Sequence, residues 1–158
     1  MPDRIVINTG PIIAFIRADA VEIIARMPLE FSCPPQVEDE IRAGAALGHL
    51  FRWPENLKVI ALSSPLDPLA QIALDAGEAA VIQLALEQGV EWVCMDDRKG
   101  RRAALAVGLK VVGSLGLLTR AKTLGIVSAV RPITDRLTRE GQWYDSELLQ
   151  RVLQSVGA

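Results

Sequence analysis

Side chains that carry oxygen atoms stand at several points where short apolar stretches of this chain end. They are Asn8 after "RIVI", Glu40 in "QVEDEI", Glu78 in "AGEAAVI", and the adjacent Asp96 and Asp97 in "CMDD". Carboxylates that converge from separate elements repel one another, so a cation or protons must share the space between them. Because oxygen ligands without His or Cys select hard ions, the sequence predicts a Mg²⁺ or Mn²⁺ site.

Four basic residues follow the two aspartates directly. They are Arg98, Lys99, Arg101 and Arg102. Cations oppose the dipole at the start of a helix, which indicates that an anion compensates them. Magnesium held by few carboxylates keeps waters and contacts substrate phosphate, so the pattern favours phosphodiester cleavage. The alternative is a solvated basic face in which Arg101 or Arg102 pairs with a nearby acid.

Each of these oxygen-bearing positions, Asn8 and the acids, also has a structural explanation. Asn8 and Asp97 are residue types that cap helices, and Asp75 with Glu78 has the spacing of a capping box. The acids at 38–40 suit the positive end of a helix dipole. Capping does not explain why an almost wholly apolar helix has Glu78 in its first turn, or why two aspartates end a buried strand.

Short apolar runs and helical patterns alternate along the chain and must position these residues. Strands are predicted at 4–8, 29–34, 57–62, 91–96 and 109–113, and helices at 9–26, 35–44, 75–89, 97–108, 114–125 and 145–157. Ser114 is the expected N-cap of its helix, and residues 63–68 are expected to form a turn-rich connector. This alternation predicts a mostly parallel sheet covered by helices.

Composition agrees with an α/β fold. The chain has 158 residues, of which 50% are hydrophobic and 4% aromatic, as expected for buried parallel strands. We expect a single domain over 1–158, with 138–158 a C-terminal helical extension that packs on it. Trp143 and Tyr144 in that extension either pack against the core or anchor an interface.

Two further classes of feature are disfavoured by the sequence. Cys33 and Cys94 lie in apolar stretches without a neighbouring His or Cys, which favours buried free thiols over a disulfide or zinc site. No apolar run has the roughly 20 residues of a membrane span, and the N-terminus lacks a secretory pattern. We therefore expect a cytoplasmic location and no membrane partner.

Charge is divided unevenly along the chain. Residues 1–97 carry 6 Lys/Arg and 15 Asp/Glu, whereas residues 98–158 carry 11 and 4. Either this asymmetry is incidental surface chemistry, or a carboxylate site adjoins a phosphate-binding surface.

The quoted motifs together resemble a known family. The segments "VINTGPIIAFIRADAVEII", "CPPQVEDEI", "DAGEAAVIQLALEQG" and "CMDDRKGRRAALAVGLKVVGSLGLLTRAKTLGIV" are similar, in this order, to a small prokaryotic PIN domain. The resemblance covers 4–137 and implies a three-layer α/β/α sandwich with a mostly parallel sheet. It also implies a Mg²⁺- or Mn²⁺-dependent ribonuclease site, frequent homodimers, and often the toxin role in a pair with a small antitoxin protein.

By this resemblance the catalytic residues are Glu40, Glu78, Asp96 and Asp97, and the metal ligands are Asn8, Glu40, Glu78 and Asp97. Thr9 and Ser114 would support the site, and Arg98, Lys99, Arg101 and Arg102 would bind RNA. Asn8 departs from the family pattern, which has an acid there. Three outcomes remain open: an active site with weaker metal affinity, a site that needs Mn²⁺ or more metal, or an inactive module that binds RNA or a protein partner.

Overall fold

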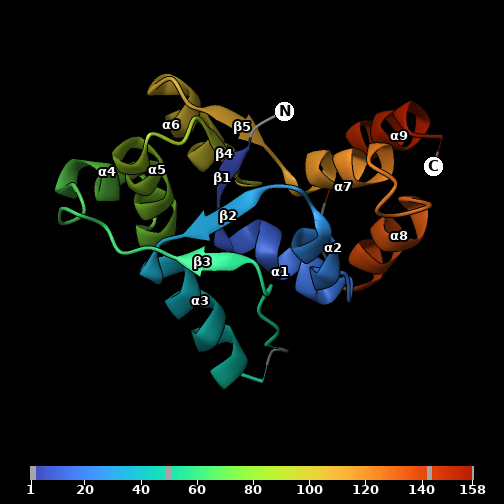
Figure 1. The fold of residues 1–158 in the computed structure, drawn as a ribbon, viewed down its shortest axis with the longest axis horizontal. Helices are drawn as coiled ribbons and strands as arrows, with labels where there is room; N and C mark the ends of the chain where they lie inside the picture. Colours follow the sequence, from blue (N-terminus) through green and yellow to red (C-terminus); the bar gives the residue numbers. More distant parts are fainter. Residues whose placement is uncertain (1–2, 49–50, 142–143, 158) are drawn as a thin grey trace.

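A five-stranded parallel sheet forms the centre of the computed structural model, which describes residues 3–48, 51–141 and 144–157 (Figure 1). The strands are β1 (Arg4–Ile7), β2 (Glu30–Cys33), β3 (Leu57–Val59), β4 (Trp92–Cys94) and β5 (Lys110–Val112). Their order in the sheet is β3-β2-β1-β4-β5, and every neighbouring pair is parallel. The predicted parallel sheet is therefore confirmed.

Nine helices of the described residues flank this sheet and complete a three-layer α/β/α sandwich, as predicted. They are α1 (Thr9–Arg17), α2 (Val21–Arg26), α3 (Pro35–Ala46), α4 (Pro68–Ala73), α5 (Ala76–Gln88), α6 (Arg98–Ala106), α7 (Ser114–Thr123), α8 (Arg131–Arg139) and α9 (Ser146–Ser155). Helices α5 and α6 pack on β1, β4 and β5, whereas α1 contacts α2, α3, α7 and α8. In Figure 1, α7, α8 and α9 lie together at the right.

The central strands are buried on both faces. Ile5, Val6 and Ile7 of β1 have no exposed surface, and neither has Val93 of β4. Helices cover both faces of this parallel sheet, so side chains that point to either face are shielded from water. This explains why the strands are continuously apolar. The two cysteines are free and buried, as predicted.

The register of β1 against β4 sets the positions of the predicted site residues. Ile7 pairs with Cys94, and the backbone N–H of Asn8 donates to the Cys94 carbonyl at 3.0 Å. The N–H of Met95 in turn donates to the Val112 carbonyl at 2.9 Å. Because parallel strands end at one edge, Asn8, Asp96 and the start of α7 emerge on the same side of the sheet.

The segment 9–26 is helical as predicted, but it is divided into two helices, α1 and α2. Asp19 between them has φ of 53°, a left-handed conformation that a continuing helix cannot contain. The backbone N–H of Ala20 instead donates to the Phe15 carbonyl at 2.8 Å, which closes the turn. Both helices present apolar residues to the core, so the hydrophobic pattern continues through the break.

Three other predicted boundaries need correction. Helix α3 continues past Gly44 to Ala46, and α4 begins at Pro68, inside the expected connector. Helix α4 buries none of its residues, so no apolar stripe in the sequence marks it as a helix. Asp67 is its N-cap, and the Asp67 side chain accepts from the N–H of Leu69 at 2.9 Å. Ser114 is the first residue of α7, and Gly113 is its N-cap.

The C-terminal residues contact the core through a few apolar side chains. Leu153 of α9 is buried, and Tyr144 is half-buried against the core. Trp143 lies outside the described residues, and the predicted domain limits stay a prediction. None of the helices in the described ranges is long and apolar enough to cross a membrane.

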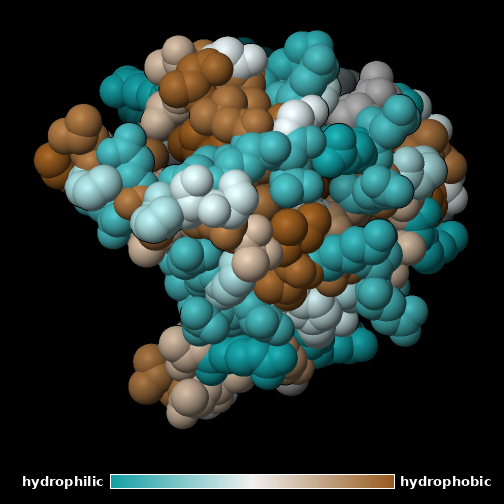
Figure 2. Space-filling view, turned by 60° about the vertical axis from the view of Figure 1, so that its left-hand side comes forward, coloured by the Kyte–Doolittle hydropathy of each residue, from teal (hydrophilic) through white to brown (hydrophobic). Residues whose placement is uncertain are grey.

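Exposed hydrophobic side chains are scattered over the surface. Leu69 and Ile72 of α4 are 75% and 80% exposed, and Leu105 and Val107 lie at the end of α6. Figure 2 shows hydrophobic areas that are separated by hydrophilic ones on this side of the molecule. Scattered exposure of this kind is normal for a folded chain.

A close contact between β5 and α7 gives the first testable prediction. A Cβ added at Gly116 would lie 2.5 Å from Cγ2 of Val112. We expect Gly116→Ala to lower the free energy of unfolding by about 1–3 kcal/mol, measured by chemical denaturation, because the packed side chain must move. Val112→Ala in the same chain should restore part of this loss.

Gly10 of α1 is the matched control, since nothing lies within 4 Å of a Cβ added there. Gly10→Ala should leave stability unchanged or raise it by up to about 1 kcal/mol through helix propensity. Equal effects of the two substitutions would contradict the close packing of α7 on β5.

Candidate functional site

Asn8 stands where β1 ends and α1 begins. It is the N-cap residue of α1 by backbone position, yet its side chain makes no capping hydrogen bond. The side chain is 7% exposed, and its Oδ1 is buried without a hydrogen-bond partner among the described residues. Capping therefore does not account for this residue, and a buried acceptor left unpaired is costly unless something else contacts it.

Thr9 and Glu40 connect α1 to α3. The Thr9 hydroxyl donates to Oε2 of Glu40 at 2.6 Å. Burial raises the pKa of Glu40 above its ordinary value; the hydrogen bond from Thr9 opposes this rise, and the Asp75 carboxylate adds to it. A Cβ at Gly77 would collide with the Glu40 carboxyl group, so glycine there lets Glu40 approach the start of α5.

Glu78 and Asp75 form the predicted capping box at the start of α5. The N–H of Glu78 donates to Oδ1 of Asp75 at 2.7 Å, and the N–H of Asp75 donates to Oε2 of Glu78 at 3.3 Å. Glu78 is only 7% exposed. Burial, followed by the negative charges of Asp75 and Asp97, raises the pKa of Glu78 to about 7. The capping box is confirmed, but it leaves Glu78 beside two other carboxylates.

Asp97 caps α6, as predicted, and is exposed to solvent. Its Oδ1 accepts from the N–H groups of Lys99 at 2.9 Å and Gly100 at 3.3 Å. A Cβ added at Gly100 would lie 3.4 Å from Cγ of Glu78, so the first turn of α6 runs close to the start of α5. The two helix starts thereby bring Glu78 and Asp97 together.

Asp96 points toward the start of α7. Its Oδ1 accepts from the N–H of Ser114 at 2.8 Å, and its Oδ2 is buried without a partner among the described residues. The Ser114 hydroxyl is fully buried and lies 2.9 Å from the hydroxyl of Tyr144. Burial raises the pKa of Tyr144 to about 12. Tyr144 was not among the predicted site residues, because a contact across 30 residues leaves no local sequence signal.

The four basic residues after Asp97 divide into two groups. Arg98, Lys99 and Arg102 are exposed. Arg101 is half-buried, and its Nη1 donates to the Met95 carbonyl at 2.9 Å. Arg101 therefore supports the end of β4, whereas the other three are accessible to an anionic ligand.

The oxygen atoms at this edge belong to carboxylate and amide groups, which are the ligand types that hard divalent cations prefer. Asn8 and Asp96 each have a buried oxygen without a partner, and the carboxyl groups of Glu78 and Asp97 adjoin. Among the residues that the structure describes, no three His, Cys, Asp or Glu side chains are grouped closely enough to hold a metal ion. The acids of this edge are therefore near one another without forming a closed metal site, and the Asn8 amide is an additional oxygen donor.

Comparison with known families adds an independent finding. A family model described as a PIN domain matches residues 4–158, a range that includes every site residue predicted above. Comparisons with curated proteins and with solved structures gave no match.

The burial of Glu78 predicts how stability depends on pH when no metal ion is bound. With an ordinary pKa of 4.5 raised to about 7, the folded protein holds this proton more tightly than the unfolded chain. The free energy of unfolding should therefore fall as pH rises from about 4.5 to about 7, by about 1–3 kcal/mol in total once solvent screening is allowed for. Glu78→Gln should remove this fall and be the more stable protein at pH 8, measured by denaturation in EDTA.

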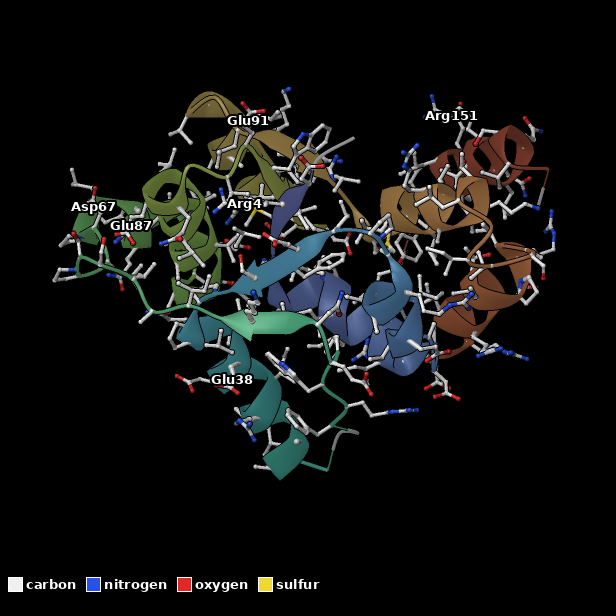
Figure 3. All side chains as sticks on the ribbon, viewed as in Figure 1. Arg4, Glu38, Asp67, Glu87, Glu91 and Arg151 are labelled. Carbon is white, nitrogen blue, oxygen red and sulfur yellow. The ribbon has the colours of Figure 1, made fainter. Side chains whose placement is uncertain are left out.

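Glu87 lies on the same helix and is labelled at the left of Figure 3; the backbone N–H of Ser63 donates to its carboxylate at 2.8 Å and lowers its pKa. Glu87→Gln should therefore give no gain in stability at pH 8. Parallel pH curves for wild type and Glu78→Gln would contradict the assigned burial.

Proposed function

This chain belongs to the PIN domain family, and on that premise we propose that it is a Mg²⁺- or Mn²⁺-dependent endoribonuclease. PIN domains are generally nucleases, that is, hydrolases that act on phosphodiester bonds. The observation that carries the proposal is the buried Glu78 beside Asp75 and Asp97, three carboxyl groups from two adjacent helix starts. Such a group of like charges is stabilised by a cation or by retained protons.

Each residue of the edge has a role in this proposal. Glu40, Glu78 and Asp97 are not grouped closely enough to form a metal site as they stand, so their carboxylates would have to move together to hold the cation, and Asn8 would add its amide oxygen. When bound, a divalent cation supplies charge neutralisation at the phosphate and a more acidic water. Asp96 would accept a proton or orient that water through its free Oδ2, while Ser114 fixes its other oxygen.

Exposed basic side chains next to the acidic edge would allow a negatively charged nucleic acid to approach it. Arg98, Lys99 and Arg102 are exposed on the same helix that Asp97 begins. Cations beside the acidic edge would contact backbone phosphates and offset their repulsion by the carboxylates. RNA as the substrate, a homodimer and a small antitoxin partner stay predictions from the sequence resemblance.

Substitution of Asp97 by asparagine tests the proposal with the least disturbance of the fold. Asparagine caps helices as well as aspartate does, so α6 should begin normally while the negative charge is lost. We expect Asp97→Asn to reduce metal-dependent cleavage of mixed-sequence single-stranded RNA by at least about a hundredfold. Cleavage is measured with the purified protein in EDTA, Mg²⁺ and Mn²⁺.

Asp67 provides a matched control, since it caps α4 in the same way and is labelled at the far left of Figure 3. Asp67→Asn should cleave as wild type does. Full cleavage by Asp97→Asn, or cleavage that persists in EDTA, would refute the proposed site.

Asn8 favours a second candidate function, a module that binds RNA or a protein partner without cleaving it. An amide brings no charge to a site whose affinity depends on ligand charge. If the native site is active, Asn8→Asp should tighten Mg²⁺ binding by about tenfold or more, measured as the Mg²⁺ dependence of cleavage. If cleavage is seen only with Asn8→Asp, the native chain is a binding module, and the nuclease proposal for it is wrong.

A further inference from the structure

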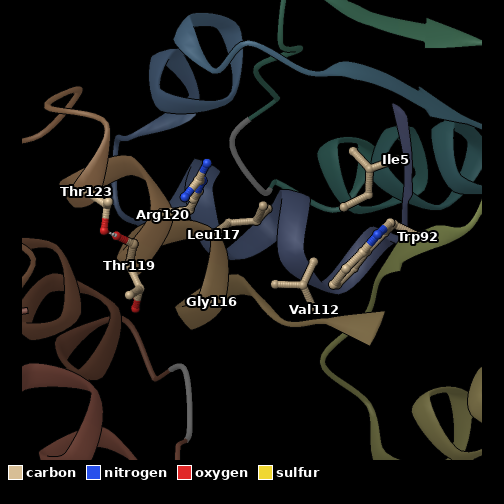
Figure 4. A pocket seen from close by; sticks show the side chains of 8 residues that line it. All are labelled: Ile5, Trp92, Val112, Gly116, Leu117, Thr119, Arg120 and Thr123. Carbon is tan, nitrogen blue, oxygen red and sulfur yellow. Dashed lines mark hydrogen bonds between the residues drawn. The ribbon is translucent and has the colours of Figure 1, made fainter. Parts of the chain in front are cut away.

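A cavity that shares no residue with the predicted site lies between the sheet and α7 (Figure 4). Its volume is about 280 Å³. The strands contribute Ile5, Trp92 and Val112 to its wall, and α7 contributes Leu117, Thr119 and Arg120 among others. Pockets of roughly this size and mainly apolar wall are typical of small-ligand sites.

Arg120 is the polar feature of this cavity that lacks a partner. Its Nε is buried and has no hydrogen-bond partner among the described residues. No described carboxylate forms an ion pair with its guanidinium. The neighbouring Thr119 hydroxyl already donates to the Leu115 carbonyl at 2.9 Å. Arg120 also lines the cavity, so an anion inside it could approach the guanidinium and offset the cost of a partly buried cation that has no described counter-ion.

The opposite end of the cavity is apolar. Figure 4 shows Arg120 and Thr119 on one side and the Trp92 ring, with Ile5, on the other; Leu117 lies between them. The wall thus offers apolar surface at one end and an unpaired cation at the other.

We propose that this cavity binds a small amphipathic carboxylate, a molecule with one carboxylate and an aromatic or branched apolar group. The carboxylate pairs with the Arg120 guanidinium, whose planar set of N–H donors matches two carboxylate oxygens. The apolar group lies against Trp92, Ile5 and Val112 and leaves water. The site is independent of the proposed nuclease function, because binding requires neither a metal ion nor a nucleic acid.

3-Phenylpropionate is the probe, titrated to about 10 mM against the isotope-labelled full chain and followed by NMR. We expect saturable shifts at the Trp92 indole N–H and at the backbone amides of 116–123. The neutral analogue 3-phenylpropan-1-ol, of the same shape, should bind at least about tenfold more weakly, because it cannot form the charged pair.

Arg120→Gln should weaken binding of the acid by at least about tenfold and leave binding of the alcohol unchanged. Arg120→Lys keeps the charge and should retain part of the affinity. The matched control is Arg151→Gln on α9, which makes the same charge change at an exposed residue outside the cavity wall and should bind as wild type does.

Three results would overturn the proposal: no saturable shift at these residues, equal affinity for acid and alcohol, or unchanged acid binding by Arg120→Gln. If Arg120→Gln fails to fold, the comparison of acid with alcohol on wild type still decides. None of these results bears on RNA cleavage, so the two proposals can fail separately.

Discussion

The parallel pairing of β1 with β4 is the constraint on which the candidate site depends. It places Ile7 beside Cys94, and the backbone N–H of Asn8 then donates to the Cys94 carbonyl. Each strand is followed almost at once by a helix, so Asn8 and Asp97 occupy the starts of α1 and α6 at one edge. A shift of this register by one residue would move Asn8 by about 3.3 Å along the edge relative to Asp96 and Asp97.

Electrostatic repulsion at this edge is opposed by the fold as a whole. Helix α5 packs on β1 and β4 and buries apolar residues there. Moving Glu78 away from Asp97 would therefore expose apolar surface. The folded chain therefore keeps carboxyl groups close together at a cost that burial elsewhere offsets. Sites that carry function are often maintained at the expense of stability in this way.

Glycine residues permit the close approaches that assemble the edge. Gly77 leaves room for the Glu40 carboxyl group, Gly100 for the Met95 side chain at the end of β4, and Gly113 for the carboxyl group of Asp96. None of the three needs a positive φ, so each is explained by space alone. The absence of a side chain likewise lets Gly116 lie close to Val112 on the wall of the cavity between the sheet and α7.

By itself the sequence determined the sheet, the apolar strands, and the caps formed by Asp97 and by Asp75 with Glu78, because alternation, burial and capping are local patterns. It did not reveal the break at Asp19 or the short α4, where a turn and an unburied helix interrupt those patterns. Only the tertiary structure decided that the Asn8 oxygen has no partner among the described residues, that Ser114 joins Asp96 to Tyr144, and that Arg120 lines a cavity with no counter-ion from the described carboxylates. These facts depend on contacts between residues far apart in the chain, and long-range packing leaves no periodic signal in one sequence.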